Sequence, residues 1–218
     1  MAEIISLTID GKKVTAQPGE KLLWVALRHG IYIPNLCALK DKNPPAASCR
    51  LCFVEIEGKK NPCPSCTQEV YAGMIVSTNT PPVLRLQRQA MNLILASHQI
   101  DCPRCRKNRD CELQRIVHHL KMKLRPEKLR RLPHNFPVDQ SHPALIFNPN
   151  KCVLCGRCVW ACREQGQGVL YFAQRGFATR ISTFLDLPLA QTACTGCLAC
   201  ERVCPVGALL PNLPPVQS

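Results

Sequence analysis

The sequence lacks the segments by which proteins cross or leave a membrane. No apolar run approaches the roughly 18 residues that a membrane-spanning helix needs. The first residues, MAEIISLTID, show no basic region followed by an apolar one, as a secretory signal would. We therefore expect neither a membrane span nor a signal peptide.

Motifs for nucleotide binding and for hydrolysis are also missing. The chain has no G-x-x-x-x-G-K-S/T loop, and Gly166-Gln167-Gly168 lacks the third glycine and the preceding strand of a dinucleotide fingerprint. No Ser/His/Asp arrangement has support from its local context. We therefore expect no NAD, flavin or substrate site and no catalytic residue in this chain.

Cysteine, by contrast, is abundant, with sixteen residues. Fifteen of them and one histidine fall into four sets of four, each with the spacing of an iron–sulfur ligand group. Many lie in C-x2-C runs, which suit metal binding better than disulfides. A reducing, cytoplasmic setting is the expectation that follows.

The strongest signal is a pair of C-x2-C-x2-C-x3-C runs, the second followed by Pro205. Such a pair is typical of bacterial-type two-cluster ferredoxins, in which the fourth cysteine of each run ligates the other cluster. Zinc, the alternative for C-x2-C pairs, needs two pairs per ion and does not account for this spacing. We predict two 4Fe–4S clusters, one on Cys152, Cys155, Cys158 and Cys204 and the other on Cys194, Cys197, Cys200 and Cys162.

A third set contains the histidine and reads H-x3-C-x2-C-x5-C. Its members are His98, Cys102, Cys105 and Cys111. An imidazole in place of one thiolate makes a site less anionic, and in Rieske centres this replacement raises the reduction potential. Structural zinc sites with three cysteines and one histidine are common, so the spacing alone leaves both metals open.

The first set is spread most widely. Cys37, Cys49 and Cys52 are clear members, and the fourth is Cys66 or Cys63. The first gap is longer than in the plant-type C-x4-C-x2-C pattern of 2Fe–2S ferredoxins, but a long loop closed by a distant cysteine follows the same logic. We choose Cys66 as the start of a predicted strand that continues to Val76, which leaves Cys63 as the one cysteine outside the four sets, with a free thiol as its simplest role.

The order of these sites gives the chain a family resemblance. It resembles the N-terminal region of the large iron–sulfur subunit of respiratory complex I and the N-terminal accessory domains of FeFe hydrogenases. Most closely, it resembles the small iron–sulfur subunit on the diaphorase side of soluble NAD-linked NiFe hydrogenases. The stretches that carry the resemblance are TIDGKKVTAQPGEKLLWVALRHGIYIPNLC, ASCRLCFVEIEG, PSCTQEVYAGMIVST, DCPRCRKNRDCELQ, KCVLCGRCVWAC and ACTGCLACERVCPVGAL.

The resemblance implies one 2Fe–2S and three 4Fe–4S clusters. It supports Cys66 as the fourth 2Fe–2S ligand and His98 as the single imidazole ligand of a 4Fe–4S cluster. Since the sequence ends at Ser218, soon after Cys204, we expect no catalytic domain. The implied role is an electron-transfer subunit between a flavin- and NAD-binding diaphorase subunit and the catalytic subunit of a hydrogenase or a formate dehydrogenase.

Charge bears on a different class of partner. The formal net charge of +13 favours nucleic acid. Fifteen ligand thiolates and four oxidised cores of about +2 each would reduce it to roughly +6. The basic stretch 121–131 has no aromatic residue for base stacking, so we expect a solvated segment or a docking surface for an acidic subunit instead.

Local patterns predict an α+β fold. Residues 4–9 and 13–16 read as a hairpin, 21–29 as a helix and 52–56 as a strand, an order that resembles the β-grasp of plant-type ferredoxins. Residues 81–97 read as a helix that delivers His98, and a second helix follows Cys111. The predicted domains are a 2Fe–2S domain at 1–79, a small helical His-ligated 4Fe–4S domain at 80–124, an irregular linker at 125–144 and a bacterial-type two-cluster ferredoxin domain at 145–218, with a Pro-rich tail.

Two other functions remain alternatives at this point. A free-standing polyferredoxin would carry electrons by diffusion, and a zinc-rich, basic module would bind nucleic acid. Bound partner subunits would distinguish the first from a fixed subunit. Brown colour would exclude the second, because thiolate-to-iron charge transfer absorbs broadly in the visible range.

Overall fold

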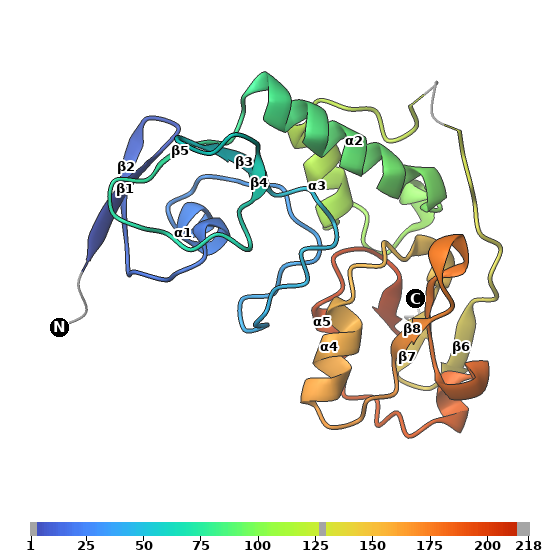
Figure 1. Ribbon diagram of the computed structural model, residues 1–218. Coiled ribbons are helices and arrows are strands. Elements are labelled where there is room, and N and C mark those ends of the chain that lie inside the picture. Colours follow the sequence, from blue (N-terminus) through green and yellow to red (C-terminus); the bar gives the residue numbers. More distant parts are fainter. Residues whose placement is uncertain (1–3, 127–129, 213–218) are drawn as a thin grey trace. The chain divides into compact units, whose positions relative to one another are not determined.

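The computed structural model describes residues 4–126 and 130–212, and the chain divides into two compact units (Figure 1). The first unit holds Met1–Leu93 and Ile116–Met122; the second holds Ile94–Arg115 and Lys123–Ser218. No helix in the described ranges is long and apolar enough to cross a membrane.

A mixed five-stranded sheet forms the first unit. Its strands are β1 (Ile5–Ile9), β2 (Lys12–Ala16), β3 (Phe53–Ile56), β4 (Cys63–Pro64) and β5 (Ile75–Ser77), in the spatial order β2-β1-β5-β3-β4. β1 runs parallel to β5, and the other pairs are antiparallel. Asp10 and Gly11 both have positive φ, as a tight hairpin turn between twisted strands requires.

Helix α1 (Leu22–Arg28) buries its apolar residues in the core of this sheet. The strands alternate buried and exposed residues, so one face of the sheet supplies Leu7, Ile9 and Val14 to that core. Arg28, the last residue of α1, forms an ion pair at 2.6 Å with Glu20, which lies just before the start of the helix. The core also includes Cys52 and Cys66, so two predicted ligands lie within the packed interior.

Two longer helices contribute residues to both units. Helix α2 (Pro81–Ser97) begins with two prolines, which fit the first turn because its N–H groups have no intrahelical acceptor. Helix α3 (Glu112–His119) follows Cys111. Both elements match the predicted positions, and His98 directly follows α2.

The second unit contains two small sheets. One has the order β10-β7-β6, with strands β10 (Leu209–Pro211), β7 (Leu145–Phe147) and β6 (Asp139–His142), and the other pairs β8 (Tyr171–Ala173) with β9 (Arg180–Ser182). Helix α4 (Arg157–Glu164) directly follows Gly156, and helix α5 (Ala199–Arg202) directly follows Leu198. The 3-10 helices are η1 (Cys102–Arg104), η2 (Pro149–Lys151), η3 (Gly176–Ala178), η4 (Phe184–Asp186) and η5 (Leu189–Gln191).

Two local predictions are wrong. Cys66 does not begin a strand but lies in a turn after β4, and it is Cys63 that is in a strand, paired with Val54. Residues 139–142, predicted as linker, form β6, because His142 and Asp139 pair with β7 and the prolines of this region flank the strand. Residues 127–129 of the basic stretch and 213–218 of the predicted tail lie outside the described residues.

Candidate functional site

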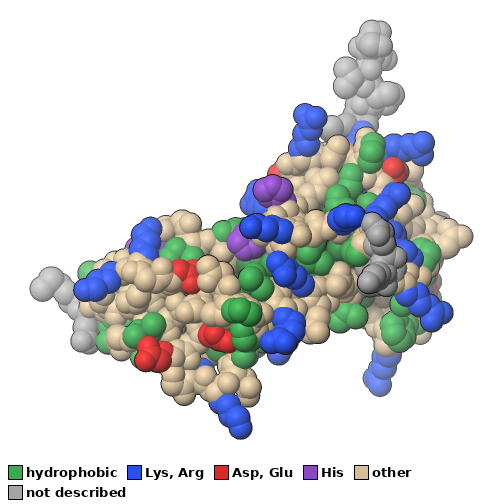
Figure 2. All heavy atoms as spheres, turned by 90° about the horizontal axis from the view of Figure 1, so that it is seen from above, with side chains coloured by type: hydrophobic (Ala, Val, Ile, Leu, Met, Phe, Trp, Pro, Cys, Tyr) green, Lys and Arg blue, Asp and Glu red, His purple; other side chains and the backbone are tan. Residues whose placement is uncertain are grey.

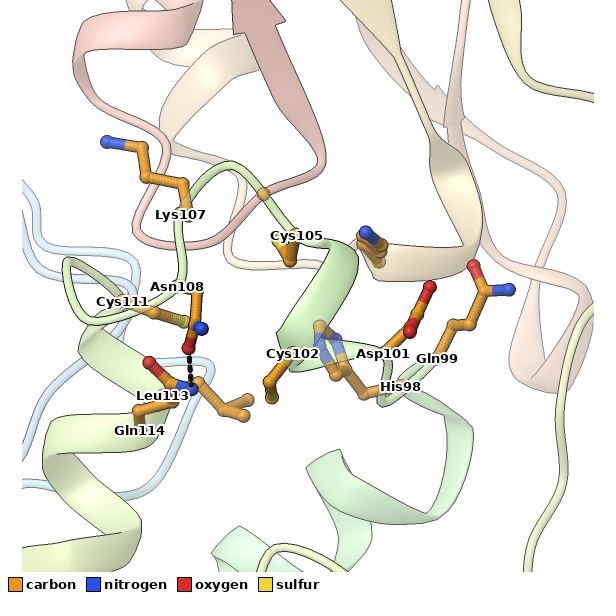
Figure 3. A pocket seen from close by; sticks show the side chains of 12 residues that line it. His98, Gln99, Asp101, Cys102, Cys105, Lys107, Asn108, Cys111, Leu113 and Gln114 are labelled. Atoms are coloured by element: carbon orange, nitrogen blue, oxygen red, sulfur yellow. Dashed lines mark hydrogen bonds between the residues drawn. The ribbon is translucent and has the colours of Figure 1, made fainter.

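The four predicted residues of the histidine set line one cavity in the second unit (Figure 3). His98 follows the end of α2, Cys102 begins η1, and Cys111 immediately precedes α3. The hollow measures about 310 Å³ with open solvent included. Figure 3 shows His98, Cys102, Cys105 and Cys111 arranged around this space, so two helix ends and a short loop bring the predicted ligands together.

The His98 ring is in a suitable state to act as a ligand. The residue is only 7% exposed, and its Nδ1 atom has no hydrogen-bond partner in the described part of the chain. Burial lowers the pKa of His98 to about 4, assisted by the charges of Lys151 and Arg131. The imidazole is therefore neutral at pH 7, as metal ligation requires.

The C-terminal loop of the second unit packs against this cavity. The Glu112 N–H donates a hydrogen bond to the Pro205 carbonyl at 3.0 Å. Gly207 lines the cavity, and a Cβ added there would lie 2.5 Å from the Cys105 Sγ. The residues just after Cys204 thus lie directly beside the histidine set.

The two C-x2-C runs line two further cavities, and each cavity contains a crossed set. Each set combines the first three cysteines of one run with the last of the other, as the spacing predicts. The hollows measure about 310 and 380 Å³, open solvent included. The first is lined by Cys152, Cys155, Cys158 and Cys204, and the second by Cys194, Cys197, Cys200 and Cys162.

The two runs share a backbone conformation. In each run the second and fourth residues after the first cysteine have positive φ, at Leu154 and Gly156 in one and at Gly196 and Leu198 in the other. A short helix follows each loop. At each of these two positions one run has a leucine and the other a glycine, yet φ is positive in both. Positive φ is rare and costly for a leucine, so the two loops share a backbone conformation that does not depend on having glycine at either position.

Burial sets the protonation of these thiols. It raises the pKa of Cys152 and of Cys200 to about 12, and that of Cys158 well above its usual value. The Leu154 amide offsets part of this rise for Cys152, because its N–H donates to the Cys152 Sγ at 3.4 Å. In the other cavity, the Val169 N–H donates to the Cys162 Sγ at 3.2 Å. Such thiols become thiolates when a metal centre compensates their charge.

The first set gathers in the first unit. Cys37, Cys52 and Cys66 are 1–2% exposed, and Cys49 is half-buried. A hydrogen bond from the Cys49 thiol lowers the pKa of Cys37 to about 5, and one from Cys66 lowers the pKa of Cys52 to about 7. A hydrogen bond with Cys52 raises the pKa of Cys66, and burial and the charges of Cys52, Cys37 and Cys49 raise it further. The pKa of Cys63 is raised chiefly by burial, and Cys52 is the only one of these thiols whose charge adds to that rise. These couplings group Cys66, rather than Cys63, with the other three thiols.

None of the sixteen cysteines, all of which lie in the described ranges, forms a disulfide. No three His, Cys, Asp or Glu side chains of the described residues lie close enough to hold a single metal ion. A single zinc ion, with Zn–S bonds of about 2.3 Å, would need thiolates within about 4 Å of one another. The ligand sets therefore stay predictions, supported by the shared cavities and the couplings between thiols.

Sequence reasoning missed two residues that belong to these surroundings. Gly207 is one, and the only signal for it was its place shortly after the last cysteine. Lys151 is the other; it lines the histidine cavity although it precedes the first cysteine of a different set. Both are brought there by tertiary packing, which the spacing of ligands does not encode.

Three family models match successive parts of the chain. They are the 2Fe-2S iron-sulfur cluster binding domain at residues 2–81, the NADH-ubiquinone oxidoreductase-G iron-sulfur binding region at 87–125 and the 4Fe-4S dicluster domain at 144–210. Iron–sulfur clusters are therefore the supported cofactors, in a fold that mixes helices and sheets.

Several curated relatives are much longer than this chain. The NADP-reducing hydrogenase subunit HndD of Solidesulfovibrio fructosivorans is 37% identical over 95% of this chain and 36% of its own length. The mitochondrial 78 kDa subunit of NADH-ubiquinone oxidoreductase of Neurospora crassa is 32% identical over 94% of this chain. The chain spans only 27% of that protein.

Two other similarities cover nearly the full length of both chains. The gamma subunit of the NAD-reducing hydrogenase HoxS of Cupriavidus necator is 32% identical over 94% of this chain and 86% of its own. A chain in the crystal structure of NAD+-reducing NiFe hydrogenase in the H2-reduced state has a TM-score of 0.86 and 31% identity, and the match covers 98% of this chain and 90% of that one. The chain therefore belongs to the family of iron–sulfur subunits that includes the gamma subunit of NAD-reducing hydrogenase HoxS.

Proposed function

We propose that this chain relays single electrons through one 2Fe–2S and three 4Fe–4S clusters inside a larger oxidoreductase complex. One neighbour would be a flavin subunit that reacts with NAD(H), and the other the catalytic subunit of a hydrogenase or a formate dehydrogenase. The observation that carries the proposal is the set of three cavities in the second unit, each lined by one complete predicted ligand set.

The proposed ligands follow those cavities and the thiol couplings of the first unit. The clusters, when bound, supply one-electron chemistry, and the chain positions them and sets their surroundings. Several of the ligand thiols are buried from solvent, as at Cys152, and backbone N–H groups donate hydrogen bonds to the sulfur atoms of Cys152 and Cys162. The 2Fe–2S set is Cys37, Cys49, Cys52 and Cys66, and the 4Fe–4S sets are the histidine set and the two crossed sets.

The second unit offers short connections between its three sites. Lys151 lines the histidine cavity and directly precedes Cys152 of the first crossed set in the sequence. Gly207, which follows Cys204 of the same crossed set by three residues, lies against Cys105 of the histidine set. Cys158 and Cys162 lie one turn apart on α4 and belong to different crossed sets. This contiguity supports a sequential path from the histidine set through the first crossed set to the second.

The finer fold assignments belong to the same proposal. The sheet of the first unit, with α1 packed in its core, supports a β-grasp 2Fe–2S domain, and the crossed sets support a bacterial-type two-cluster ferredoxin domain. The boundaries at residues 79, 124 and 144 stay predictions. We also place the complex in the cytoplasm, where the cysteine ligands stay reduced before clusters are inserted.

Cys155→Ala tests the relay in the purified complex. It removes a ligand of the first crossed set, so we expect electron transfer from NADH to the terminal catalytic subunit to be lost. Reduction of a dye by NADH at the flavin should persist, because that reaction does not need the relay. Long-range transfer at the unaltered rate in Cys155→Ala would overturn the sequential path, and Cys63→Ser serves as a cysteine control that should retain it.

A further inference from the structure

We propose that the ammonium group of Lys151 tunes the histidine centre, making the cluster held by His98, Cys102, Cys105 and Cys111 easier to reduce. This inference rests on the proposed function, because it concerns a cluster at that site. Lys151 is not a predicted ligand, so it would act on the cluster only through the electric charge of its ammonium group.

The backbone around Lys151 is fixed to the loop that carries His98. Gln99 N–H donates a hydrogen bond to the Asn150 carbonyl at 2.8 Å. Asn150 is 7% exposed, and its side-chain amide bonds both backbone groups of Phe136, at 2.8 and 2.9 Å. The Asn148 side chain caps the start of η2 by accepting from Asn150 N–H. Lys151, the last residue of η2, therefore has a well-defined place beside the cavity.

Lys151 lines the same cavity as His98, Cys102 and Cys105. Its charge is also close enough to lower the pKa of His98, second only to burial. Among the described residues, no carboxylate forms an ion pair with Lys151. Within the described part of the chain, its ammonium group is therefore not held in an ion pair.

Lys107 is a natural comparison, since it lines the same cavity. Its Nζ lies 3.6 Å from the Asp110 carboxylate, which offsets its charge. Figure 3 shows the Lys107 side chain directed away from His98 and Cys105. Two lysines of one cavity therefore differ in pairing and direction.

The sign of the effect follows from the charge of the site. Three thiolates around an oxidised core of about +2 give a net charge of about −1, which becomes about −2 on reduction. A nearby cation stabilises the more negative state more strongly. The Arg131 guanidinium, 3.0 Å from the His98 carbonyl oxygen, acts in the same direction, and the Asp101 carboxylate at the cavity wall opposes it.

A potentiometric EPR titration of the full-length protein tests the inference. Lys151→Gln, Lys151→Arg and Lys107→Gln would be compared with the unaltered chain, and the signal of the histidine centre would be assigned as the one altered by His98→Cys. We expect that signal to titrate at a more negative potential in Lys151→Gln alone. The remaining cluster signals should keep their potentials and intensities.

The failure of this inference and the failure of the proposed function give different results. If the assigned signal is intact in Lys151→Gln but titrates at its original potential, the inference is wrong and the relay stands. If the unaltered protein shows no iron–sulfur signal at all, the proposed function is wrong. Should Lys151→Gln lose the centre, Lys151→Met, which keeps most of the apolar stem, makes the same comparison.

Discussion

Gly207 and Cys105 approach each other so closely that a side chain at position 207 would force the Cys105 sulfur to move: an added Cβ would lie 2.5 Å from the Cys105 Sγ. Gly207 does not have the positive φ that would itself exclude a side chain. Alanine there therefore acts through contact alone. Since both groups lie at the cavity of the histidine set, the consequence should appear in that centre.

We predict that Gly207→Ala disturbs the histidine centre selectively. The methyl group would displace the Cys105 thiolate, so iron content should fall by up to about four atoms per chain. The 2Fe–2S signal in reduced EPR spectra provides an internal control and should keep its intensity. An unchanged iron content with an unchanged set of 4Fe–4S signals would contradict this prediction.

A matched pair of cysteine variants tests the first set. Cys66→Ser should remove the 2Fe–2S signal and about two irons per chain, because serine is a poor replacement for a thiolate ligand. Cys63→Ser should retain both, since its thiol is coupled to only one of the predicted ligands. EPR of the dithionite-reduced variants makes the comparison, and the reverse pattern would assign Cys63 as the ligand.

The pH dependence of alkylation gives a second test of Cys63. Burial raises the pKa of the Cys63 thiol above its ordinary value of 9.0. Only the thiolate reacts with iodoacetamide, so labelling of the cluster-loaded protein should be slow at pH 7 and rise only above pH 9. Peptide mass spectrometry should find the label on Cys63 and not on the ligands. Labelling at neutral pH as fast as that of an unshielded cysteine would contradict the raised pKa.

The crossed sets predict which variants share a phenotype. Cys204→Ser and Cys152→Ser should alter the same 4Fe–4S signal, although the residues belong to different runs of the sequence. Cys162→Ser should instead match Cys194→Ser, because these two line the other cavity. Redox-resolved EPR of the four variants checks the grouping, and pairing by run rather than by cavity would refute it.

Regular elements could be predicted wherever a pattern repeats. The hairpin at Asp10-Gly11 and the helix over residues 81–97 follow from turn chemistry and apolar periodicity, and both are present. The two-residue strand at Cys63 could not be predicted, because Pro62 and Pro64 flank it and no alternation exists over two residues. β6 was missed for a related reason: its pairing with β7 is a tertiary contact in a proline-rich stretch.

The candidate site divides in the same way. Ligand spacing predicted the sets that line each cavity, since a loop that wraps a cluster fixes the distance between its ligands along the chain. It could not predict Lys151 or Gly207, which reach the histidine cavity from segments far away in sequence. The face drawn in Figure 2 carries many Lys and Arg side chains and few acidic ones, as the composition predicts, but composition does not indicate which of them face a cluster.

The central claim is that this chain carries four iron–sulfur clusters, and the most direct test is its metal and sulfide content together with EPR after anaerobic purification and dithionite reduction. We predict about fourteen irons per chain, with one 2Fe–2S signal among several 4Fe–4S signals. A result of about ten irons would mean that one 4Fe–4S cluster is absent, and the histidine centre would be the first site to test. Little iron and a stoichiometric amount of zinc would contradict the electron-transfer account entirely.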